Sequence, residues 1–68
     1  MLNKNLLKGA MASKGFTQGN VAELIGMSEN TLSSRMNGTS FFNTDEIDEL
    51  CKVLDITDNN LKAAIFLS

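Results

Sequence analysis

The sequence predicts an all-α protein of five short helices that form one domain over residues 1–68. Apolar residues recur three and four positions apart along most of the chain, which is the period of an amphipathic helix. Residues that begin or end helices, such as Thr17 and Ser28, divide the chain into about five segments. A composition that is 43% hydrophobic and 21% charged, with no proline, is typical of a compact domain and excludes a disordered chain.

The first two helices are predicted over residues 3–14 and 17–25. Gly15 follows the first, where a helix C-terminus favours a residue with positive φ. Thr17 is a good N-cap for the second, which stops at Gly26 after about two turns. The apolar stripes of the two helices consist of Leu6, Leu7, Ala10 and Met11, and of Val21, Ala22, Leu24 and Ile25.

Two further helices are predicted in the second half of the chain. Asn43 and Thr44 cap the fourth helix, and Glu46 makes a capping-box pair with Asn43 if Asn43 is the cap. Thr57 or Asp58 caps the fifth helix. Their apolar residues follow helical spacing, at Ile47, Leu50, Cys51 and Leu54, and at Leu61, Ala64 and Ile65.

The most specific feature lies at residues 17–38, where two helices of about eight residues flank a short turn that begins at Gly26. The glycine gives the turn its backbone freedom, and Ser28 caps the third helix, predicted over 28–37. Ala22 is small enough to let the two helices cross closely. This is the spacing of a helix-turn-helix, and the residues that lock it onto the core are Val21, Ile25, Met27, Leu32 and Met36.

The residue types present exclude most catalytic chemistry. Histidine, tryptophan and tyrosine are absent, which removes the commonest general base and metal ligand. Cys51 is the single cysteine, and it lies on an apolar stripe, so we expect an inert thiol. Residues 58–60 lack the glycine and distal glutamate of a calcium loop. We therefore expect no enzyme, no cofactor and no metal site.

The cysteine count and the hydropathy pattern also bear on the compartment. One cysteine cannot form an internal disulfide, which fits a reducing cytoplasm. The sequence contains no apolar stretch of signal-peptide or membrane-spanning length, so no membrane contact is expected.

A family resemblance runs from Leu6 to about Leu61, and its marks are Gly15, Phe16, Thr17, Gln18, Val21, Ala22, Gly26, Met27, Ser28, residues 30–33, Asn37 and Gly38. With these residues the chain resembles the Cro/CI-like (XRE-type) helix-turn-helix regulators, in particular small ones from the lysogeny switches of temperate phages of Gram-positive bacteria. The resemblance implies a five-helix, lambda-repressor-like DNA-binding domain in the cytoplasm of a bacterial host cell. In size and acidic balance the chain also resembles the modulator-of-repression proteins of lactococcal phages, which act by complexing the phage repressor.

The resemblance assigns DNA contacts to the start of the second helix and to the exposed face of the third, the recognition helix. Gln18 matches the position that bonds a phosphate and steadies the recognition helix. Asn30 suits an adenine edge, Thr31 offers a methyl group to thymine, and Glu29 accepts from cytosine N4 while repelling phosphate. The full set of expected DNA contacts is Gln18, Ser28, Glu29, Asn30, Thr31, Ser33, Ser34 and Arg35.

The net charge of −2 looks unfavourable for a DNA-binding protein, but the charges are unevenly distributed. Residues 1–38 carry four cations and two acids, whereas residues 39–68 carry two cations and six acids. Contacts from all four N-terminal cations would give a salt slope of only about −3.6 per monomer. We therefore expect a monomer to bind operator DNA weakly, so either a homodimer doubles the contacts or the main partner is a protein.

Two surfaces are candidates for a protein partner such as a phage CI-type repressor. Asp45, Glu46, Asp48 and Glu49 lie in the first turns of the fourth helix, where acids suit the helix dipole and solubility. Together with Glu29, they can equally form a negative surface complementary to the basic DNA-reading face of a repressor.

The second candidate surface is apolar. Adjacent side chains rarely point the same way, so one of Phe41 and Phe42 is expected to be exposed, with Phe42 the candidate partner contact. The apolar tail at 65–67 either closes the core or contacts a partner or a second copy, and it is either helical or extended.

The sequence thus leaves two functions open. The first is a transcription regulator of a phage lysis/lysogeny switch that binds operator DNA through residues 28–37. The second is a modulator of repression that forms a complex with the CI-type repressor. A toxin–antitoxin partner has little support.

Overall fold

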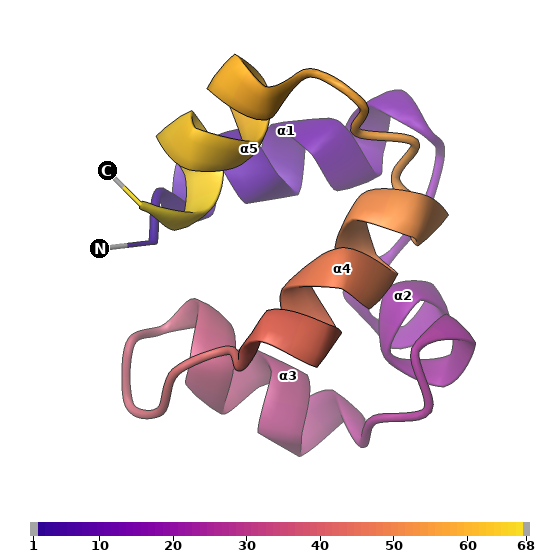
Figure 1. Ribbon diagram of the computed structural model, residues 1–68. Helices are drawn as coiled ribbons and strands as arrows, with labels where there is room; N and C mark the ends of the chain where they lie inside the picture. Colours follow the sequence, from indigo (N-terminus) through magenta and orange to yellow (C-terminus); the bar gives the residue numbers. More distant parts are fainter. Residues whose placement is uncertain (1, 68) are drawn as a thin grey trace.

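The computed structural model describes residues 2–67 (Figure 1). These residues form five helices and contain no strand, which confirms the all-α prediction. The helices are α1 (Lys4–Ser13), α2 (Gln18–Leu24), α3 (Glu29–Met36), α4 (Thr44–Val53) and α5 (Asn59–Phe66).

A polar side chain caps the N-terminus of each helix by accepting a hydrogen bond from a backbone N–H of the first turn. Of the two caps considered for α5, Asp58 is the one used, and it accepts from the N–H of Asn60. The predicted capping box of α4 is present, with Glu46 accepting from the N–H of Asn43. The caps of the five helices are Asn3, Thr17, Ser28, Asn43 and Asp58.

Glycines end the first two helices in the left-handed conformation. Gly15 has a φ of 74° and Gly26 a φ of 69°, values that favour glycine because it has no Cβ. The N–H of Met27 then donates to the carbonyl of Ala22 at 2.9 Å, which closes the turn between α2 and α3. The turn therefore has the backbone conformation that the sequence predicts.

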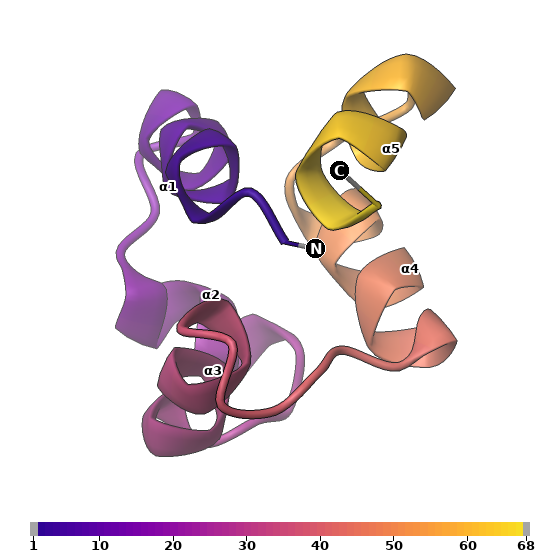
Figure 2. The ribbon, with the colours of Figure 1, turned by 90° about the vertical axis from the view of Figure 1, so that its left-hand side faces the viewer.

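Every helix contributes to one hydrophobic core. α2 contacts both α3 and α4, while α1 lies beside α5 (Figure 1). The N–H of Asn3 donates to the carbonyl of Ile65 at 2.6 Å and so joins the two ends of the chain (Figure 2). The buried side chains are Leu7, Met11, Val21, Ala22, Leu32, Met36, Leu50, Leu54, Ile56, Ile65 and Phe66.

The tail is helical to Phe66, and the core uses most of it. Ile65 is fully buried and Phe66 nearly so, which leaves Leu67 as the exposed apolar side chain of this segment. An extended tail and an interface built from all of residues 65–67 are therefore both wrong, because two of the three side chains close the core.

Three residues of the predicted stripes are exposed: Leu6, Leu24 and Leu61, of which Leu24 is the most exposed. Leu24 was expected on the apolar face of α2, but its side chain is 55% exposed. Val21 and Ala22 fill the inward face of this two-turn helix, and Leu24 is its last residue. A helix this short has room for few inward positions.

Leu50 and Leu24 provide a matched test of this core. We expect Leu50→Ala to lower the free energy of unfolding by about 2–5 kcal/mol, because it leaves a cavity at a fully buried site. Leu24→Ala should cost about 0.5 kcal/mol or less. Urea unfolding followed by circular dichroism measures both, and equal losses would contradict the assignment of the core.

Candidate functional site

Residues of α2 and α3 that the resemblance assigned to DNA lie on one connected unit. The Nε2 of Gln18, the first residue of α2, donates to the Oγ of Ser33 at 3.0 Å in a partly buried position. Leu32 and Met36 of α3 are buried, so the same helix is anchored from its inner face. The bond from Gln18 and the buried side chains together set the orientation of α3.

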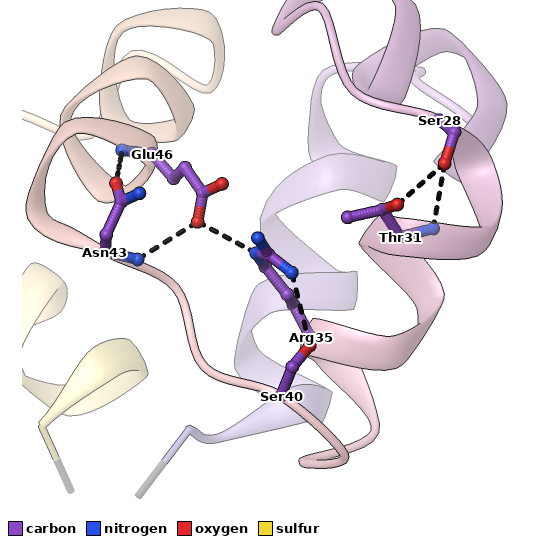
Figure 3. Close-up of polar contacts among 6 residues, drawn as sticks. All are labelled: Ser28, Thr31, Arg35, Ser40, Asn43 and Glu46. Atoms are coloured by element: carbon purple, nitrogen blue, oxygen red, sulfur yellow. Dashed lines mark hydrogen bonds and ion pairs between the residues drawn. The ribbon is translucent and has the colours of Figure 1, made fainter.

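The hydroxyl groups at the start of α3 are used within the helix itself. The Oγ of Ser28 accepts from the N–H of Thr31 at 3.1 Å and donates to its Oγ1 at 2.8 Å (Figure 3). Ser33 is held by Gln18, and Ser34 is half-buried. Within the described residues, Glu29 and Asn30 are thus the exposed members of the predicted DNA-contacting set on α3, and the others are half-buried.

Arg35, which the resemblance placed among the DNA contacts, is bound to α4. Its Nε donates to the Oε1 of Glu46 at 2.8 Å, and its Nη1 donates to the Oγ of Ser40 at 3.2 Å (Figure 3). The side chains of Arg35 and Glu46 are only 22% and 20% exposed. The same Oε1 accepts from the N–H of Asn43, so one carboxylate caps α4 and holds α3.

The charges of this pair are stabilised in place. The hydrogen bond from Arg35 lowers the pKa of the Glu46 carboxyl, and the hydrogen bond to Glu46 raises the pKa of Arg35. Both groups are therefore ionised at neutral pH. An arginine held this way does not reach a DNA phosphate unless it first leaves the carboxylate.

Sequence reasoning treated Glu46 as a cap and as a possible partner contact, and it missed the link to Arg35. The two residues are separated by 11 positions that include a loop and a helix cap. No local spacing rule connects them. The available signal was that the single cation of α3 and the capping-box glutamate of α4 flank the same loop.

A second carboxylate lies at the outer end of the helix pair. A Cβ built on Gly19, in the first turn of α2, would stand 3.3 Å from the Oε2 of Glu29. Glu29 is also the first residue of α3, where a negative charge interacts favourably with the helix dipole. The exposed end of the α2–α3 pair therefore carries negative charge.

The acidic residues of α4 are largely matched by cations. Asp48 accepts from the Nζ of Lys62 at 3.3 Å, and Glu49 lies 4.0 Å from the Nζ of Lys52. With Glu46 bound to Arg35, Asp45 is the member of the predicted acidic cluster that has no ion pair within the described residues. The cluster is therefore less negative than the sequence suggests.

The two adjacent phenylalanines differ in exposure, as expected, but the exposed one is not Phe42, which was the predicted partner contact. Phe42 is half-buried and meets the ring of Phe66 edge to face, with centroids 5.9 Å apart. Phe41 is 83% exposed. Phe41, rather than Phe42, is the exposed aromatic residue of the loop, because one ring fills the space over α5.

Other chemistry is not assembled in the part of the chain that the structure describes. Residues 2–67 contain no group of three or more acids and cysteines placed to hold a metal ion. Burial raises the pKa of the half-buried Cys51 thiol, which disfavours its reactive thiolate. No helix in this range is long and apolar enough to cross a membrane.

One known protein family matches nearly the whole chain. Residues 3–67 match the family described as "Protein of unknown function (DUF739)". The chain belongs to this family. No curated protein and no solved structure matches this DUF739 protein.

The pKa shift of Glu46 makes the stability of this DUF739 protein depend on pH. Because the folded-state pKa lies below the unfolded value, the stabilisation is present above the ordinary carboxyl range and is lost as pH falls through the folded pKa. We expect Glu46→Gln to lower the thermal midpoint at pH 7. The difference from the unmodified protein should shrink as pH falls below about 4.

Glu49→Gln is the control, because it removes the same charge from an exposed position at the 4.0 Å pair with Lys52. Its effect should be small at every pH. Calorimetry across the pH range measures all three proteins, and a difference for Glu46→Gln that stays constant with pH would contradict the ion pair.

Proposed function

We propose that this DUF739 protein is a helix-turn-helix transcription regulator of a phage lysis/lysogeny switch and that it binds operator DNA through α3. The observation that supports this proposal most is the geometry of α2 and α3. Two short helices meet at a tight turn, and the second has its inner face buried and its N-terminal face exposed. The resemblance to the Cro/CI-like regulators, carried by the same residues, also supports it.

The proposed complex inserts the N-terminal end of α3 into the major groove. Asn30 is exposed and suits the donor and acceptor edge of adenine. The Thr31 hydroxyl is bonded to Ser28, so Thr31 contributes chiefly its methyl group. Ser34 supplies a further hydroxyl group. Gln18 reaches a phosphate only if it shares or gives up its bond to Ser33.

Electrostatics make this binding weak for a single copy. Arg35 is held by Glu46, and Lys14 lies 3.4 Å from Asp55. Lys4 and Lys8 remain as cations of the N-terminal half that pair with no carboxylate in the described residues. With two free cations, the salt slope is about −1.8 per monomer, so stable operator binding requires a second copy on the same DNA.

A second candidate function is modulation of a CI-type repressor through a protein complex. The observation that favours it is the carboxylate of Glu29 at the exposed end of the helix pair, beside Gly19. A negative group there repels a DNA phosphate and attracts a basic protein surface. In this role the protein covers the DNA-reading face of the repressor instead of reading DNA.

One titration distinguishes the two functions. The pure protein is added to operator DNA with and without the repressor of the same phage, at several salt concentrations. A sequence-specific shift by the protein alone, reduced by Asn30→Ala, supports direct reading. An altered repressor shift together with a co-eluting heterocomplex supports modulation. If neither DNA nor the repressor binds at micromolar concentrations, both proposals fail.

The ion pair between α3 and α4 gives a sharper prediction for DNA binding. Glu46→Gln keeps a side chain that can cap α4 but frees Arg35 for a phosphate. We expect the salt slope of binding to mixed-sequence duplex DNA to become steeper by about 0.9. The affinity at low salt should rise by roughly tenfold.

Glu49→Gln again provides the comparison, since it changes the net charge equally without freeing an arginine. It should leave the slope unchanged. Fluorescence anisotropy with a labelled duplex measures both variants. Identical slopes for the two variants would show that Arg35 is not what limits binding.

A further inference from the structure

An open apolar groove lies at the C-terminal end of α3, between the α3–α4 loop and the ends of α1 and α5. Its volume is about 670 Å³, and its apolar walls include Leu2, Met36, Phe42, Ile47 and Phe66. Phe42 and Phe66 meet edge to face and form a packed floor. The groove is a different surface from the exposed end of α3, because Asn37 and Gly38 at its wall follow the last residue of that helix.

Phe41 borders this groove and is the most exposed large apolar side chain of the described residues, at 83%. An aromatic side chain has only two χ angles, so it offers a large contact area at a low cost in conformational entropy when a partner covers it. Rings in this position are frequent anchors of protein interfaces. The groove therefore offers both a depression and a projecting contact.

The cation at the rim indicates the charge of the occupant. Lys4 lines the groove, and its Nζ donates to the amide oxygen of Asn37, a neutral acceptor. Lys4 and Lys8 lie one turn apart on α1, and neither pairs with a carboxylate within the described residues. Arg35 also lines the groove, but Glu46 neutralises it. A complementary ligand therefore carries carboxylates.

We propose that this groove binds a helix of another protein that presents bulky apolar side chains with carboxylates one turn away. Residues 2–67 offer no strand edge on which an extended peptide could pair, whereas a helix can present several bulky side chains from one face to an apolar groove. Its apolar side chains cover Phe41 and fill the groove, and its carboxylates meet Lys4 and Lys8. This contact leaves the exposed end of α3 uncovered, but it uses Lys4 and Lys8, the two lysines that also remain free for DNA phosphates.

The test uses a fluorescently labelled helical peptide with leucine and phenylalanine on one face and glutamate one turn from them. A second peptide replaces every glutamate with lysine. We expect the acidic peptide to bind the full chain and the lysine peptide to bind at least about tenfold more weakly. Amide NMR shifts should concentrate at Met36, Gly38, Phe42 and Phe66.

Matched variants identify the contact. Phe41→Ser should weaken binding of the acidic peptide about tenfold or more, whereas Leu24→Ser removes another exposed apolar side chain, away from the groove, and should have no effect. Lys4→Glu should reverse the preference between the two peptides. Lys52→Glu introduces the same charge change at an exposed position on α4 and should not.

Three results would overturn the proposal: equal binding of the two peptides, equal effects of Phe41→Ser and Leu24→Ser, or a Phe41-dependent dimer in sedimentation without peptide binding. The DNA titration is run on Phe41→Ser as well. Because that variant should keep any DNA shift, failure of the groove proposal and failure of the DNA proposal are distinguishable.

Discussion

In residues 2–67, eleven buried hydrophobic side chains form the one core that five short helices share, and this small core determines what remains on the surface. Leu32 and Met36 of α3 are buried in this core. The other faces of the helix therefore leave Glu29 and Asn30 exposed and bring Arg35 to Glu46 of α4. In the loop after α3, Phe42 packs against Phe66 of the core and Phe41 stays exposed. The exposed end of α3 and the apolar groove are both consequences of the same limited core.

The ion pair of Arg35 with Glu46 limits the positive charge that is available for the proposed DNA contact. Counted from the sequence, residues 1–38 have a net charge of +2. In the structure the single cation of α3 is neutralised by a capping residue of α4, and Glu29 adds a carboxylate at the exposed end. The helix pair that we propose to contact DNA therefore contributes no unpaired cation.

Local rules predicted most of the fold, because capping and helix termination depend on neighbouring residues. Thr17, Ser28 and Asn43 cap helices as predicted, and Gly15 and Gly26 end them with positive φ. The site was harder to predict, because its contacts join distant residues. The Arg35–Glu46 pair, the bond from Gln18 to Ser33 and the inward turn of Phe42 follow from tertiary packing that no spacing pattern encodes.

We propose that the exposed N-terminal end of α3 contacts DNA while Arg35 stays on Glu46. An NMR titration of the labelled protein with a mixed-sequence duplex at low salt tests it directly and remains sensitive to weak binding. We expect amide shifts to concentrate at Gln18 and residues 29–34, while the Arg35 Nε–H signal keeps its position. Shifts confined to the lysines of α1, or no shifts at all, would contradict it.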